Sequence, residues 1–178
     1  MFSLFGRKEI QPKITDRVFI SSVARQNAIV EKARSQRVLV IITWFDESYH
    51  LVQSSLQSNN LQTEIYLARE IAAHNIQTRP VLFFEHYPLL QKEIELIRRL
   101  QLKEVIFYSA LDEPLFKHFG GEKIISLMQK MGLSENEAVE HSMIGAAIRN
   151  AQEKLSKEIM VEHTAMSQAE WFSKNLVK

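Results

Sequence analysis

An unbroken run of β-branched and aliphatic residues, VLVII at positions 38–42, constrains the fold of this chain more than any other stretch. The run has no polar residue to face water, so it predicts a central strand of a parallel sheet that is covered on both faces. Parallel strands are joined by long crossovers, which are usually helices. The segments on either side of the run should therefore alternate between helices and strands.

Four further stretches have the length and composition of strands, and the segments between them have helical spacing or turn residues. The expected strands are residues 17–20, 38–42, 63–68, 81–84 and 105–108. The third of them alternates enough between apolar and polar residues to indicate a flank position. This order predicts an α/β fold, a three-layer sandwich with a mainly parallel five-stranded sheet and C-terminal helices.

Each helix between these strands should have one apolar face. Ser21 or Ser22 can cap the first helix, because a serine oxygen accepts from the free N–H groups of a first turn. Asp46 is the expected cap of the second helix, and Pro88 fits the first turn of the third. The residues expected to face the core are Val23, Ile29, Val30, Ala33, Tyr49, Leu51, Val52, Leu56, Leu90, Ile94, Ile97 and Leu100.

The stretch 115–155 predicts two helices with a stop and a start between them. Gly132 can take positive φ past the end of the first helix. Ser134 is the expected N-cap of the second, with Glu137 three residues later to complete a capping box. One apolar stripe should run along this long helix, made of Val139, Ile144, Ile148, Ala151, Leu155 and Ile159. Packing and capping explain this stretch, which demands no catalytic role.

Composition excludes several classes of protein. A chain of 178 residues can form one domain with a real core, and its net charge of +1 gives no electrostatic reason to bind nucleic acid or a membrane surface. It has no cysteine for a disulfide or a thiolate metal site. No apolar run approaches the ~20 residues that span a bilayer, and the first residues have the wrong order for a secretory signal. We expect a cytoplasmic protein without stable membrane insertion.

Candidate catalytic and metal-binding residues are few. Gly120 and Gly121 lie in a helix-to-helix bend and not in a phosphate loop, and no nucleophile elbow occurs. His86 beside Glu85, at the C-terminal end of a strand, is the best candidate for chemistry, because parallel sheets present ligands there. A structural strand-end role is the simpler interpretation. No pair has the i, i+4 spacing of a helical metal clamp among His50, His74, His86, His118, His141 and His163.

No residue is therefore assigned as catalytic, cofactor-binding or metal-binding, and no cofactor is expected. Trp44 and Phe45, which follow the central strand, leave two interpretations open. They can form an exposed aromatic patch at the edge of the sheet, or they can be buried against the following helix.

The C-terminal stretch also carries a resemblance to a known family. The segments FYSALD at 107–112, LFKHFGG at 115–121 and EAVEHSMI at 137–144 occur in the order of matching segments in the preprotein translocase motor SecA. There, the second motor domain ends and the helical scaffold begins. The resemblance implies a RecA-like α/β domain at residues 16–111 and a helical extension packed on it at 112–178. Residues 1–15 are expected to form a flexible arm.

The motifs with which that family hydrolyses ATP are missing from this sequence. No G-x-x-x-x-G-K-[ST] phosphate loop is present. The family's arginine-bearing loop is replaced by an amphipathic helix, in which Arg98 and Arg99 can be read as relics but are more simply solvated charges. We therefore expect a protein that is not an enzyme, with no ATPase activity and no micromolar ATP affinity.

The expected function is protein binding, as a non-catalytic accessory to protein export or as a self-associating scaffold. Trp171 and Phe172 supply large apolar side chains in the tail, which should fold back on the sheet or meet another chain. A homodimer through the C-terminal helices is one expected form. The alternative is a small enzyme or nucleotide-binding protein that uses the sheet edge around residues 43–46, Glu85 and His86. An exposed apolar face would favour binding, and a ligand at that edge would favour the alternative.

Overall fold

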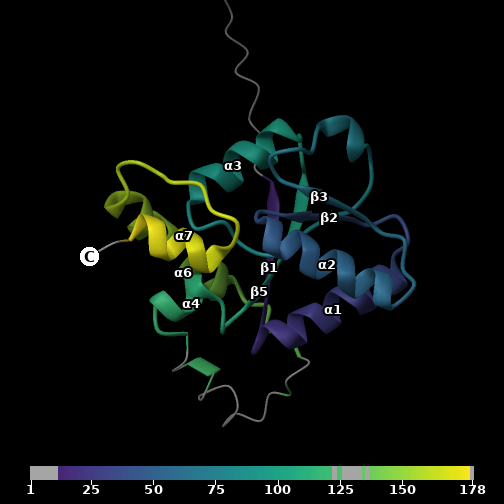
Figure 1. The fold of residues 1–178 in the computed structure, drawn as a ribbon, viewed down its shortest axis with the longest axis horizontal. Helices are drawn as coiled ribbons and strands as arrows, with labels where there is room; N and C mark the ends of the chain where they lie inside the picture. Colours follow the sequence, from purple (N-terminus) through teal and green to yellow (C-terminus); the bar gives the residue numbers. More distant parts are fainter. Residues whose placement is uncertain (1–11, 122–123, 126–133, 135–136, 177–178) are drawn as a thin grey trace, which may run out of the picture.

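The computed structural model describes residues 12–121, 124–125, 134 and 137–176. Its centre is one sheet of five parallel strands in the order β1-β5-β4-β2-β3 (Figure 1). The strands are β1 (Lys13–Phe19), β2 (Val40–Thr43), β3 (Glu64–Leu67), β4 (Val81–Phe83) and β5 (Glu104–Ala110). All five expected strands are present and β3 lies at the flank, so the predicted α/β class is confirmed. β1 begins at Lys13, inside the stretch expected to be an arm.

Helices cover both faces of the sheet and complete three layers. One face packs on α1 and α2, and the other packs on α3 and on the segment that contains η1. A third group, α4, α6 and α7, gathers at the side where β1 and β5 lie (Figure 1). The helices are α1 (Ser22–Ser35), α2 (Asp46–Ser58), η1 (Ala73–Asn75), α3 (Leu90–Arg99), α4 (Pro114–His118), α6 (Ser142–Glu158) and α7 (Gln168–Asn175).

The observed N-cap of α1 agrees with the one expected from the sequence, whereas the N-cap of α2 differs from it. Ser21 caps α1, with its hydroxyl oxygen accepting from the N–H of Ala24 at 3.1 Å. Phe45, and not Asp46, is the N-cap residue of α2. The Asp46 carboxylate accepts two hydrogen bonds from Arg69, at 2.8 and 2.6 Å, in a bidentate pair.

Two residues expected in the core are exposed, and one charged residue takes an inward position. Val23 faces solvent because α1 turns Ala24 and the next residue towards the sheet, and Leu51 lies on the outer side of α2. On α3, Glu93 is buried together with Leu96 and the following isoleucine. The inner face of this helix therefore carries a carboxylate into the core.

The long helix expected after Ser134 is wrong in its first part. Val139 is extended and forms an antiparallel bridge with Val18, with N–H to O distances of 3.0 and 2.9 Å. β1 is an edge strand with unpaired backbone groups, and this bridge satisfies the N–H and the carbonyl of Val18. The helix begins only at Ser142, and His141 caps it by accepting from the N–H of Met143 at 3.2 Å.

Half of the expected capping box is present, because the Glu137 carboxylate accepts from the N–H of Ser134 at 3.1 Å. Gly132 and most of the preceding expected helix lie outside the described residues. In the part of the chain that is described, no helix is long and apolar enough to cross a membrane.

The tail folds back on its own chain. Trp171 is 0% exposed, and its indole N–H donates to Glu162 at 2.9 Å. Phe172 is partly buried against the apolar group of α4 and α6. The Gln168 side chain accepts from the N–H of Leu115 at 2.9 Å, which ties α7 to α4. Trp171 is therefore a core residue, and of the two expectations for the tail, folding back on the same chain holds for this side chain.

Trp171→Ala should lower the free energy of unfolding by about 3–5 kcal/mol, because it leaves a large cavity and removes a buried hydrogen bond. Met160→Ala is the matched control in the same tail, since Met160 is 98% exposed. Urea denaturation of both variants measures the difference. Equal midpoints for the two variants would show that the tail does not dock as described.

Candidate functional site

The sheet order creates a crevice between β2 and β4. The chain leaves β2 through α2, which covers one face, and leaves β4 through α3, which covers the other. Neighbouring parallel strands whose connections diverge in this way leave space outside their carboxyl ends, where ligands of α/β proteins commonly bind. The residues named in the sequence at 43–46, Glu85 and His86 all lie at this edge.

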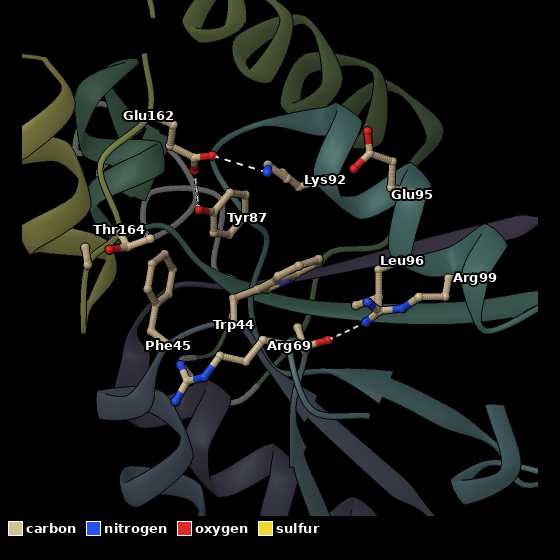
Figure 2. Close-up of a pocket in the computed structure, with 12 residues that line it drawn as sticks. Trp44, Phe45, Arg69, Tyr87, Lys92, Glu95, Leu96, Arg99, Glu162 and Thr164 are labelled. Atoms are coloured by element: carbon tan, nitrogen blue, oxygen red, sulfur yellow. Dashed lines mark hydrogen bonds and ion pairs between the residues drawn. The ribbon is translucent and has the colours of Figure 1, made fainter. Parts of the chain in front are cut away.

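A cleft of about 480 Å³ opens at this point, a size that is typical of ligand pockets (Figure 2). Its walls come from the ends of β2, β3 and β4, from one face of α3, and from the connection between α6 and α7. We refer to it as the switch-point cleft. Its aromatic and charged lining residues are Trp44, Phe45, Arg69, Tyr87, Lys92, Glu95, Arg99 and Glu162.

Aromatic rings form the floor of the switch-point cleft. Trp44 stacks on Phe83, with ring centroids 5.9 Å apart, and lies 4.9 Å from the ring of Tyr87. Phe45 stacks on Tyr87 at 5.6 Å and is almost fully buried. The Tyr87 hydroxyl donates to Glu162, so the connection before α7 holds the floor in place. Of the two interpretations of the aromatic pair, burial holds for Phe45, whereas Trp44 is half-buried and faces the cleft.

Cations form the rim. Lys92 and Arg99 project from α3, and Arg69 follows β3 (Figure 2). The Arg99 guanidinium donates to the carbonyl of Ala68 at 2.8 Å, and the Lys92 ammonium lies 3.5 Å from a Glu162 oxygen. The structure thus places Arg99 at the cleft.

A buried carboxylate beneath the floor fixes the two strand ends relative to each other. Glu85, after β4, accepts from the backbone N–H of Trp44 at 3.2 Å and from the Ser48 hydroxyl at 2.6 Å. Burial raises the pKa of Glu85, although the nearby Arg25 partly opposes the shift. Arg25 itself pairs with Glu113, and burial lowers its pKa to about 10.

His86 lies deeper, between two carboxylates. Its Nδ1 is 2.9 Å from Glu93 Oε1, and its Nε2 is 3.1 Å from Asp16 Oδ1. The ring stacks on Phe107 with centroids 4.3 Å apart. Burial alone lowers the pKa of His86, but the Glu93 and Asp16 carboxylates outweigh it and raise the pKa to about 9. His86 is therefore an imidazolium at neutral pH, and its role here is to hold three elements together.

Sequence reasoning found His86 but missed both of its partners. Glu93 could have been noticed, because it stands one turn before the inward residues of α3. Asp16 has no comparable signal, because its neighbours in β1 are the polar, half-buried Thr15 and Arg17. Within the described residues, no group of three or more histidine and acidic side chains could hold a metal ion.

Helix α6 approaches this charge cluster through a glycine. A Cβ atom at Gly145 would collide with the Asp16 carboxylate, so a larger residue there would require this buried side chain to move. Arg149, one turn later, lies 3.9 Å from the same carboxylate. The C-terminal extension is thereby fixed to the sheet at the residue that also binds His86.

The stability of the fold should depend on pH through His86. The pKa of His86 is higher in the folded state than in the unfolded chain, so the protonated side chain stabilises the folded state. This contribution is fully present below the unfolded pKa of about 6.5 and is lost as the pH rises through about 9. We expect the free energy of unfolding to fall by on the order of 3 kcal/mol across that window. His86→Gln should remove this pH-dependent part, whereas the exposed control His50→Gln should keep it. Equal slopes for the wild type and His86→Gln would contradict the assignment.

Comparison with known proteins finds relatives for part of the chain. No protein-family model matches it. It is 47% identical over 49 residues to protein translocase subunit SecA 1 of Alkaliphilus metalliredigens, which is 28% of this chain and 6% of that protein. The SecA subunits of Acidithiobacillus ferrooxidans and Syntrophus aciditrophicus are also 47% identical over 49 residues, or 5% and 6% of their lengths.

The chain thus matches only a small part of the length of these curated relatives. These matches confirm the resemblance to SecA that the sequence motifs indicated. The chain is a partial relative of the SecA translocase subunits, similar to them over one stretch of 49 residues.

Proposed function

We propose that this chain is a SecA-like module for protein export that binds a partner protein without catalysing a reaction, and that the partner docks at the switch-point cleft. Similarity to translocase subunits supports the link to export. The observation that carries the binding role is the lining of the cleft, where Trp44 and Tyr87 lie beside two arginines. Tryptophan, tyrosine and arginine are the residue types that dominate the energy of protein interfaces.

Exposed apolar side chains beside the cleft support the same proposal. Met160, Val161 and Met166 are 98%, 71% and 59% exposed, and they flank the residues of the α6–α7 connection that line the cleft. Methionine is flexible and polarizable, so it adapts to partner surfaces of different shape. The buried faces of α6 and α7 are used within the chain, and this connection offers apolar area to a partner.

The local backbone argues against a phosphate site. Nucleotide-binding loops use glycines so that several backbone N–H groups can surround a phosphate. After β2, this chain has the bulky pair Trp44 and Phe45, and the N–H of Trp44 is already bound to Glu85. This arrangement supports a role without ATP.

A second candidate is a small enzyme or a binder of small molecules at the same cleft. Its support is the position of the cleft at the carboxyl edge and its volume of about 480 Å³. The two candidates differ in what enters the cleft, so the experiments below separate them.

Photo-crosslinking in the native host tests the binding role. A photoreactive residue at Val161 should crosslink to a component of the export machinery or to a secretory precursor, and Trp44→Ala should abolish the crosslink. Val38 is the matched control, because it is 58% exposed and precedes β2 at the opposite edge of the sheet. Equal crosslinking from both valines, or a partner without a role in export, would refute the proposal. A crosslink between two copies would favour the self-associating scaffold.

Millimolar Mg-ATP should leave the thermal denaturation midpoint of the full chain unchanged. A ligand present at a hundredfold excess over its Kd would stabilise the fold by ~2.7 kcal/mol, which differential scanning fluorimetry detects easily. A midpoint that rises by several degrees with ATP, and not with equal ionic strength of sulfate, would favour the nucleotide-binding alternative.

A further inference from the structure

We infer that the switch-point cleft accepts an acidic peptide segment, with a large apolar side chain placed over Trp44 and carboxylates on either side of it bound by Lys92 and Arg99. This inference rests on the proposed function, because it names the chemistry of the partner at the same site. Charge, spacing and the aromatic floor each contribute one part of it.

The first part is the supply of free donors. A guanidinium has five N–H donors, and among the described residues Arg99 directs one of them to the Ala68 carbonyl. Its remaining donors are open to a carboxylate, which a guanidinium binds in a planar, bidentate manner. The Lys92 ammonium is half exposed and lies 3.5 Å from Glu162, a carboxylate that also accepts from the Trp171 indole. Both cations can therefore bind a further carboxylate.

The second part is spacing. Lys92 and Arg99 are seven residues apart on α3, and both line the cleft together with Glu95 and Leu96. Seven residues of helix rise by ~10 Å, which is also the span of about three residues of an extended chain. Glu95 lies between the two cations and repels a carboxylate placed at the centre. The complementary segment has acidic residues at both ends and an apolar residue between them.

The third part is the floor. Trp44 is half-buried, and its ring lies against Phe83 below and Tyr87 beside it. Such a rigid aromatic surface gives an apolar side chain a large contact area at little cost in conformational entropy. The indole Nε1 of Trp44 is buried without a hydrogen-bond partner among the described residues. Its N–H is a donor that a small shift of the ring would offer to a peptide carbonyl.

An acidic peptide fits this cleft better than a nucleic acid. Among the lining residues, Arg69 is already bound by Asp46, and Lys92 and Arg99 lie in the same cleft as Glu95 and Glu162, so the cleft has two cationic positions and no continuous positive surface. A nucleic acid has a phosphate at every nucleotide and needs a continuous cationic track. The whole chain has a net charge of only +1.

The test uses the full chain and the fluorescence of Trp44, since the other tryptophan is fully buried. The probe is a short synthetic peptide with two glutamates about three residues apart and a phenylalanine between them. The peptide should change the fluorescence in a saturable manner, and Arg99→Glu should weaken its binding at least ~10-fold. High salt should also weaken binding of the peptide to the wild-type chain. Arg37→Glu, an exposed charge reversal before β2, should bind as the wild type does.

Three results would overturn the inference. These are equal or tighter binding of the peptide with lysines in place of its glutamates, displacement of the acidic peptide by a single-stranded oligothymidylate, and unchanged binding to the Arg99→Glu chain. The crosslinking assay separates this inference from the proposed function. If Trp44→Ala loses the cellular crosslink and Arg99→Glu keeps it, the binding role stands and the acidic class is wrong. If the peptide binds as expected but Val161 gives no crosslink, the cleft chemistry stands and the export role is wrong.

Discussion

The buried imidazolium of His86 is the interaction on which the rest of the structure depends. It lies between Asp16 of β1 and Glu93 of α3, at the end of β4, so a single charged ring joins three elements that are distant in sequence. A buried charge without partners is costly, and here the imidazolium is held between two carboxylates. A Cβ atom at position 145 would collide with the same Asp16 carboxylate, so glycine there allows α6 to lie close to the sheet.

The backbone next to His86 holds the C-terminal extension in place. Gln168 donates to the carbonyl of His86 at 3.1 Å, and Gln152 donates to the carbonyl of Tyr87 at 2.7 Å. Glu162 then binds the Tyr87 hydroxyl and completes the wall of the cleft. The loop after β4 is thus bonded through its backbone to α6 and α7, and through its side chains to β1 and α3. The shape of the switch-point cleft is therefore a property of the tail as much as of the sheet.

Sequence patterns predicted the parts of this fold that local chemistry decides. Apolar runs marked the strands because a strand covered on both faces leaves no place for polar residues. The start of α6 was misplaced because Val139 has helical spacing but pairs with β1, a tertiary contact that overrides local preference. Glu93 could have been recognised from its inward position on α3, whereas the buried charge of Asp16 is recognisable only when its partner is known. The cleft could be located from topology, but its lining of α3 and tail residues could not.

The position and the chemistry of this cleft have different causes. A parallel sheet with diverging connections leaves a crevice at the carboxyl ends of its strands whatever its sequence, so the fold alone decides where a ligand can bind. The side chains decide which ligand that is. Here the N–H of Trp44, which a phosphate loop would offer to a nucleotide, is bound to Glu85, and the indole ring packs against Tyr87. Because Glu85 also binds Ser48 of α2, this backbone donor is held from within the core, and freeing it would require a change beneath the surface as well as on it.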